Sequence, residues 1–247
     1  MEVLLIDVMG DESSIVQAAR VSYGDGTKSV SEDKALVRYL MRHWHTTPFE
    51  MVEFKFRVKC PIFVARQLMR HRTASINEYS ARYSIVKNEF WTPKMFRGQS
   101  KTNNQASDGV FANDQLMLEY TQACENSFTV YQKMLDAGVS REIARAVLPQ
   151  STFTEFYWKI DLHNLLHFLR LRMDSHAQPE IQELSALVWT YVRDKFPTVA
   201  QAFIDYRVDA VTFSGPEIRG EELSKGERRE FDLKPRPGPR PGPRSST

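Results

Sequence analysis

The chain has 247 residues, 42% hydrophobic and 26% charged, which is an ordinary balance for a globular protein with one sizeable core. Its formal net charge of +2 excludes a protein that binds polyanions through overall composition alone. No stretch approaches the roughly 18 apolar residues that a membrane span requires. The two cysteines, Cys60 and Cys124, are too few and too far apart for a disulfide framework. We therefore expect a cytoplasmic protein that does not interact with membranes.

The first half of the chain alternates strand and helix patterns. We expect strands at residues 2–8 and 52–60, helices at 32–43 and 61–71, and a loop at 43–51. In the second strand, every other residue is apolar, which predicts one buried face and makes Cys60 a packing residue. Ser31 is placed to cap the first helix, and Pro61 suits the first turn of the second.

The second half is richer in helices. We expect loops at 72–84 and 97–108, helices at 114–135, 141–148, 162–173 and 179–196, and a strand at 152–160. Ser140 and Asp161 are placed as N-caps, while Gly138, Pro149 and Pro197 are placed as stops. The pattern predicts an α+β fold, with an antiparallel or mixed sheet packed with a helical half.

The C-terminal end differs from the rest in composition. We expect a folded domain over residues 1–220 and a disordered tail over 221–247, charged at first and then rich in Pro, Arg and Gly. The final stretch, 234–247, should be extended because its prolines prevent both helix and sheet pairing. A solvated appendage is favoured there over a proline-rich docking segment.

A cationic segment over residues 70–82 carries the strongest functional signal. Three arginines and a histidine stand there with one acidic residue, Glu78. Adjacent cations repel each other and favour an anion, and arginine binds phosphate through a planar fork of donors. Gln67 and Arg70 are three residues apart on the predicted helix and should share a face. From the residues alone, a site for a phosphorylated ligand and a basic patch without a special role remain equally open.

The spacing of this segment resembles a family signature. The pattern Arg-His-Arg-x-x-Ser-x-Asn-x-x-Ser-x-Arg, filled by residues 70–82, is similar to that of the flavin-dependent thymidylate synthases (ThyX family). The resemblance covers roughly residues 1–213. Further similar stretches are HWHTTPFE (43–50), CPIFVARQ (60–67), SREIARAVLP (140–149) and HFLRLRMDSHAQPEIQ (167–182).

The resemblance implies a reaction and an assembly. It implies reductive methylation of dUMP to dTMP, with 5,10-methylenetetrahydrofolate as carbon donor and NADPH-reduced FAD as hydride source. No covalent cysteine intermediate is implied. The implied assembly is a homotetramer whose active sites draw residues from several subunits.

The resemblance also implies roles for individual residues. Those implied to contact FAD are His45, Thr47, Arg70, His71, Arg72, Glu78, Asp161, His163 and His167. Those implied to bind dUMP are Gln67, Arg70, Glu78, Ser80, Ala81, Arg82, Arg145 and Arg172.

Arg172 is the expected catalytic residue. It borders the apolar stripe of the helix at 162–173, so its half-buried guanidinium needs an acceptor, for which a structural salt bridge is the ordinary answer. The resemblance implies instead that it contacts the uracil and favours loss of the N3 proton.

Three alternatives to this interpretation exist. His163 and His167, four residues apart, have the spacing of metal ligands, but no third ligand is apparent and Arg170 would repel a cation, so we expect no metal. A cysteine-dependent thymidylate synthase would use Cys60 or Cys124. A nucleic-acid-binding module would use the cationic segment and the basic tail, and we expect no nucleic-acid partner.

Overall fold

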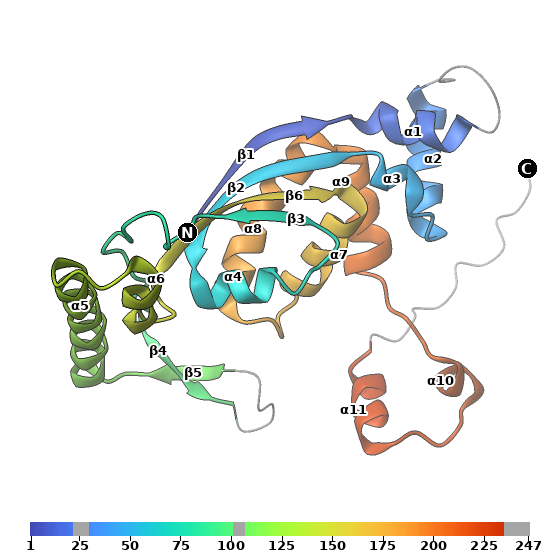
Figure 1. Ribbon diagram of the computed structural model, residues 1–247. Helices are drawn as coiled ribbons and strands as arrows, with labels where there is room; N and C mark the ends of the chain where they lie inside the picture. Colours follow the sequence, from blue (N-terminus) through green and yellow to red (C-terminus); the bar gives the residue numbers. More distant parts are fainter. Residues whose placement is uncertain (22–29, 101–106, 235–247) are drawn as a thin grey trace, which may run out of the picture.

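One antiparallel sheet forms the centre of the protein (Figure 1). The structure is a computed structural model and describes residues 1–21, 30–100 and 107–234. The strand order is β1-β2-β6-β3, with β1 at Glu2–Met9, β2 at Glu53–Pro61, β6 at Phe153–Asp161 and β3 at Ser75–Glu78. Each neighbouring pair is antiparallel. The predicted α+β class is confirmed, whereas the homotetramer stays a prediction.

One face of the sheet is buried under helices. Alternate residues of β2 and β6 point to this face, where Phe56 pairs with Trp158 and both are fully buried. The covering helices are α4 (Ile62–Leu68), α7 (Leu162–Arg172) and α8 (Pro179–Lys195), each in contact with a strand. The opposite face carries exposed polar side chains such as Arg57 and Tyr157. The alternation expected in the sequence is therefore the alternation of burial.

Helices gather at one end of the sheet (Figure 1). They are α1 (Glu12–Arg20), α2 (Val30–Arg42), α3 (Thr47–Glu50) and α9 (Pro197–Phe203), followed by a π-helical turn, η3 (Ile204–Val208). Asp11 begins α1 with a capping box. The Asp11 carboxylate accepts from the Ser14 backbone amide, and the Ser14 hydroxyl accepts from the Asp11 backbone amide. Apolar spacing had not predicted α1.

A second, smaller cluster lies at the other end of the sheet. It contains the hairpin of β4 (Phe96–Gln99) and β5 (Ser107–Phe111), the long helix α5 (Asp114–Asp136), α6 (Arg141–Ala144) and the 3-10 turn η2 (Arg145–Val147). Val86, Tyr131 and Ala144 form its buried centre.

The C-terminal part of the described chain holds two short helices. These are α10 (Gly215–Arg219) and α11 (Lys225–Leu233), which lie apart from the sheet in Figure 1. Lys234 binds the Glu217 carboxylate at 2.6 Å and ties their ends together. Part of the predicted tail, Lys225–Leu233, is thus helical in the structure, and Ser224 begins this helix with a capping box. Residues 235–247 lie outside the described residues, and the domain boundary at 220 stays a prediction.

Several predicted boundaries also need correction. Ser31 lies inside α2 and is not its cap, because the helix begins at Val30. The helix expected over 61–71 ends at Leu68, since the His71 amide turns back to the Leu68 carbonyl at 3.0 Å. Pro197 follows the end of α8 as predicted, and it also opens α9, where its missing N–H costs nothing.

Two predicted loops contain strands. β3 lies in the segment 72–84 and the β4–β5 hairpin overlaps the segment 97–108, whose residues 101–106 lie outside the described residues. β3 and the two strands of the hairpin are held by backbone pairing, and none of the three shows a hydrophobic alternation in its sequence. No helix in the part of the chain that the structure describes has the length and apolar character to cross a membrane.

Candidate active site

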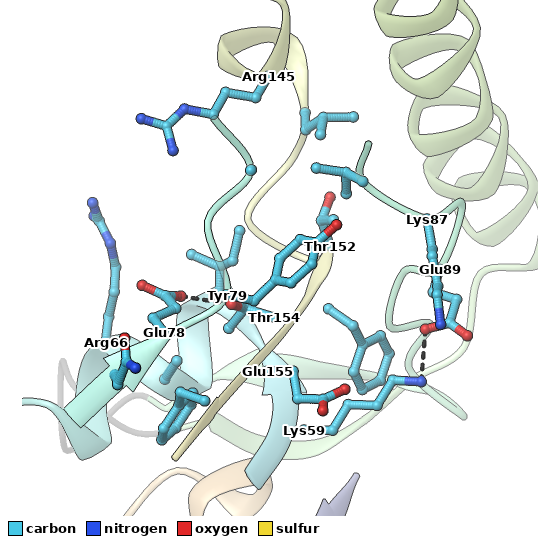
Figure 2. Close-up of a pocket in the computed structure, with 18 of the residues that line it drawn as sticks. Lys59, Arg66, Glu78, Tyr79, Lys87, Glu89, Arg145, Thr152, Thr154 and Glu155 are labelled. Carbon is cyan, nitrogen blue, oxygen red and sulfur yellow. Dashed lines mark hydrogen bonds and ion pairs between the residues drawn. The ribbon is translucent and has the colours of Figure 1, made fainter. Parts of the chain in front are cut away.

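A cavity of about 820 Å³ opens beside β2, β6 and β3 (Figure 2). Its walls come from these strands, from α4, from the segment after β3 and from η2. Its lining includes the aromatic rings of Tyr79, Phe153 and Tyr157 and charged groups such as Glu78 and Arg145. Its volume lies within the range of about 300–1,000 Å³ that small-molecule sites occupy.

The charges of the cavity are unevenly paired. Lys59 binds Glu89 at 2.7 Å and Arg57 binds Glu155, so these four charges are satisfied internally. The guanidinium groups of Arg66 and Arg145 make no ion pair or hydrogen bond with any described residue, and Figure 2 shows both side chains on the opposite side of the view from the Lys59–Glu89 pair. Two unpaired guanidinium groups at one cavity are suited to an anionic ligand.

Glu78 is held in this cavity by a residue that the sequence did not reveal. The buried Thr154 hydroxyl donates to Glu78 Oε1 at 2.6 Å. Glu78 Oε2 has no hydrogen bond to a described side chain, so it remains available to accept from a ligand N–H or O–H. The available signal was a threonine on the inward face of a strand whose other inward residues are apolar.

A second cluster forms around His71 and Arg172. Arg172 Nε donates to His71 Nε2 at 3.1 Å, and the imidazole packs edge-on against Phe168 with ring centroids 5.0 Å apart. Burial lowers the pKa of His71 to about 4, with further contributions from the positive charges of Arg172 and His167. Since His71 is neutral at pH 7, Nε2 accepts from the arginine and Nδ1 carries the proton.

The partner of Arg172 differs from the ordinary expectation. A half-buried guanidinium is usually met by a carboxylate, but Arg172 is met by a neutral ring. Burial lowers the pKa of Arg172, and the charge of Arg70 lowers it further. The positive charge therefore stays uncompensated, which fits a site that awaits an anion.

A third group surrounds the N-terminal end of α3. The Arg207 guanidinium stacks on the Trp44 ring at 3.3 Å from its centroid, and Arg170 lies 5.9 Å from the same ring. Trp44 has a left-handed backbone with φ of 63°. His45 follows it, and Thr47 opens α3. Trp44 and Arg207 were not among the predicted site residues.

The remaining predicted residues are distributed as follows. Of those named from the sequence, Glu78, Ala81 and Arg145 line the 820 Å³ cavity. Gln67 donates to Gln178 on the helical side, and the Arg82 side chain lies 3.8 Å from Glu142 beside a separate hollow. Asp161 caps α7 by accepting from the Asn164 amide at 2.9 Å. Arg70 follows α4 in a turn, so it does not share a helical face with Gln67.

Other predicted residues lie outside the cavity. His71, His167 and Arg172 form the second cluster, and the Arg82 amide donates to the Ser80 hydroxyl at 3.3 Å. Arg72 and His163 are not among the residues that line the cavity. One chain therefore holds the predicted residues in several places rather than in one pocket.

Neither thiol is placed as a nucleophile. Cys60 is fully buried on β2, and burial raises its pKa to about 12. Cys124 is also buried and contacts the Ser151 hydroxyl at 3.4 Å. Because the thiolate is the reactive form, these surroundings do not support covalent cysteine catalysis. Among the described residues, no group of three or more His, Cys, Asp or Glu has a metal-binding arrangement.

Together, the fold and the site define a class. This is an α+β protein with unpaired arginines and aromatic rings around an open cavity, and a second cationic cluster on the helical side of the sheet. Such a surface suits planar ligands that carry phosphate.

Comparison with known proteins places the chain in a family. The thymidylate synthase complementing protein family (Thy1) matches residues 4–198. A flavin-dependent thymidylate synthase of Thermus thermophilus is 52% identical over 217 residues, covering 88% of this chain and 80% of the relative. The enzyme of the same name from Wolbachia pipientis is 51% identical over 230 residues, covering 90% and 81%. The chain belongs to this family, and the predicted resemblance is confirmed.

Solved structures agree with this assignment. The UMP/dUMP methylase PolB from Streptomyces cacaoi, bound with 5-Br dUMP, is 36% identical with a TM-score of 0.78, covering 84% of this chain and 96% of that one. The same enzyme bound with 5-Br UMP gives a TM-score of 0.76. The expectation that the chain is a methyl-transferring enzyme is thereby confirmed.

Proposed function

We propose that this protein methylates dUMP to dTMP with FAD as its cofactor, 5,10-methylenetetrahydrofolate as carbon donor and NADPH as reductant. The observation that carries the proposal is that one cavity of a chain in this family holds two arginines without ion-pair partners among the described residues and one oriented carboxylate, Glu78. A related fold has been solved with a bromo-analogue of dUMP, which supports the choice of substrate.

The cavity offers a complementary group for each part of a pyrimidine nucleotide. Arg145 and Arg66 provide charged donors for a phosphate. Glu78 Oε2 provides an acceptor for a ligand N–H or hydroxyl, and Thr154 fixes its orientation. Aromatic rings such as Tyr79 and Tyr157 provide surface for a planar base. The proposed dUMP set is completed by Ser80, Ala81 and Arg82, which follow Tyr79 in the sequence, and by Gln67, Arg70 and Arg172.

The described residues also fit a flavin dinucleotide. A planar ring system with a pyrophosphate requires aromatic surface and cations. Arg70 and His71 of the second cluster and the stacked Arg207–Trp44 pair supply both kinds of group. We propose that His45, Thr47, Arg70, His71, Arg72, Glu78, Asp161, His163 and His167 contribute to this site. When bound, FAD supplies the hydride that completes the methyl group.

Arg172 is proposed to activate the uracil electrostatically. Its Nε is engaged by His71, which leaves its terminal amino groups for a ligand. Because His71 is neutral, it orients the guanidinium without cancelling its charge. A fixed, uncompensated cation stabilises the anion that forms when uracil loses its N3 proton. The ring carbon C5 then becomes a better nucleophile without any enzyme thiol.

The proposed site needs more than one chain. In a single subunit, Arg145 lines the cavity whereas Arg172 belongs to the second cluster. A homotetramer with shared active sites would bring these groups to one ligand, and we propose that assembly. The cytoplasmic location and the absence of a nucleic-acid partner stay predictions.

The absorption spectrum of the purified protein tests the proposal. We expect a yellow protein with flavin bands that bleach on anaerobic addition of NADPH. We also expect dTMP to form only when dUMP and methylenetetrahydrofolate are both supplied. A protein that neither contains nor takes up flavin would refute the proposal. UMP should be assayed in parallel, because the related PolB is described as a UMP/dUMP methylase.

A further inference from the structure

A series of hydrogen bonds, called the relay below, runs from the β4–β5 hairpin to α4 through the side chains of Arg97, Glu180, Gln178 and Gln67. Arg97 on β4 binds the Ser107 hydroxyl at 2.8 Å and Glu180 Oε1 at 2.7 Å. Gln178 Nε2 donates to Glu180 Oε2 at 2.7 Å. Gln67 Nε2 in turn donates to Gln178 Oε1. Helix α4, which carries Gln67, contacts helix α8, whose N-cap residue is Gln178.

The Glu180 carboxylate fixes the order of donors and acceptors along the relay. Glu180 is ion-paired with Arg97, and a carboxylate can only accept hydrogen bonds. The Gln178 amide must therefore present its NH₂ group to Glu180 and its carbonyl oxygen to Gln67. That carbonyl in turn requires the NH₂ group of Gln67. The Gln67 carbonyl oxygen is consequently left free to accept, beside the second N–H of the same amide.

We propose that Glu180 and Gln178 are positioning residues that hold Gln67 with its carbonyl oxygen toward the nucleotide. This inference rests on the proposed function, in which Gln67 contacts dUMP. An unrestrained glutamine amide can present either its carbonyl or its NH₂ group. The relay removes this ambiguity, because one N–H of the Gln67 amide is held by Gln178 and the carbonyl oxygen is left to accept a hydrogen bond from a ligand N–H or hydroxyl.

Two features show that the relay is more than surface pairing. Gln178 occupies the N-cap position of α8, yet its side chain does not cap the helix and is used for Gln67 and Glu180 instead. Glu180 is also buried, with a side chain that is 5% exposed. A buried carboxylate is costly unless its oxygens are bonded, and both oxygens are occupied by members of the relay.

A double-mutant cycle on the FAD-loaded enzyme tests the inference. The affinity for dUMP is measured by calorimetry for the wild type, Gln67→Ala, Gln178→Met and the double variant. We expect Gln178→Met to weaken dUMP binding by about threefold to tenfold, the range of one hydrogen bond. In the Gln67→Ala background, the same change should have less than about a twofold effect, because Gln178 acts only through Gln67.

Two further variants guard against an indirect effect on folding. Glu180→Gln keeps the size of the side chain but removes the acceptor-only end, and its effect should likewise vanish in the Gln67→Ala background. Gln201→Met is the matched control, since Gln201 donates to the Asp205 carboxylate at 2.8 Å on another helix and has no link to Gln67. Each variant's melting temperature is recorded, and the control should bind dUMP as the wild type does.

The possible failures can be told apart. A wild-type holoenzyme without measurable dUMP affinity would overturn the proposed function, and the relay's role with it. If the wild type binds dUMP but Gln178→Met has no effect, the relay alone is refuted. Equal losses from Gln178→Met with and without the Gln67 side chain would also refute it, since a purely structural role predicts that result.

Discussion

Arg172 is the residue on which the proposed chemistry depends most. Replacing it with alanine should leave the flavin spectrum unchanged but lower kcat for dTMP formation by about 100-fold or more, because a fixed cation at a developing anion contributes on that scale. Steady-state assays with saturating dUMP measure the loss. Arg193→Ala, which removes an exposed guanidinium paired with Asp194, is the control. Near-normal turnover of the Arg172 variant would contradict the assigned role.

Thr154 lets the orientation of Glu78 be tested separately. Thr154→Val keeps the shape of the side chain and removes the donor to Glu78 Oε1. We expect dUMP affinity to fall by about threefold to tenfold, as for the loss of one hydrogen bond to a binding group. Thr190→Val is the matched control, because the Thr190 hydroxyl donates only to the Leu187 carbonyl at 2.7 Å on α8. Equal affinities in both variants would show that Thr154 does not orient the ligand contact.

His71 links the second cluster to pH. Its pKa falls from 6.5 in the unfolded chain to about 4 in the folded protein, chiefly through burial. Between these values the unfolded state binds a proton that the folded state does not, so stability is lost as pH falls through this window. The midpoint of urea unfolding of the apoprotein should therefore decrease more steeply from about pH 6.5 to about pH 4 in the wild type than in His71→Gln.

The sequence predicted which residues have functional side chains better than it predicted the side chains that contact them. Glu78, Arg145 and Arg172 follow from the family spacing, and the structure gives each of them surroundings suited to a ligand. Thr154 and Gln178 could not be predicted, because their partners lie 76 and 111 residues away. Such contacts depend on tertiary packing, which local periodicity does not encode.

At the scale of elements, burial decided which predictions held. The strands expected at 52–60 and 152–160 are confirmed as β2 and β6, because each buries one full face and so carries an alternating pattern. β3 was not predicted because it is a short, polar strand that pairs, among the described residues, with β6 alone. Its pairing nevertheless places Asn77 and Glu78 of the cationic segment against the sheet, which a loop would not do.

The α10–α11 unit should be dispensable for the central fold. Its internal contacts, such as the packing of Phe213 against Phe231 and the Lys234–Glu217 pair, are made within the unit. The family match ends at residue 198, before the unit begins. A chain that stops at residue 213 should therefore melt within about 2 °C of the full chain and retain its flavin. A larger fall in melting temperature would show that α10 or α11 stabilises the body.

At the scale of the whole molecule, the separation of Arg145 from Arg172 points to assembly. If one active site takes Arg145 from one subunit and Arg172 from another, two inactive variants can restore each other. Arg145→Ala and Arg172→Ala should each be inactive alone. After they are unfolded and refolded together in equal amounts, random assortment should rebuild up to about one quarter of the sites with both arginines.

This complementation separates a shared site from a self-contained one. A site built within a single chain gains nothing from mixing, because every chain in the mixture lacks one arginine. The recovered activity should also follow the tetramer in sedimentation, since free subunits cannot share groups. A mixture of Arg172→Ala and Arg193→Ala controls for dilution. Arg193 has no proposed role, so half of the chains in that mixture carry both site arginines. A mixture of the two site variants that stays as inactive as its components would place both arginines in one subunit, and would require each chain to close around the nucleotide when it binds.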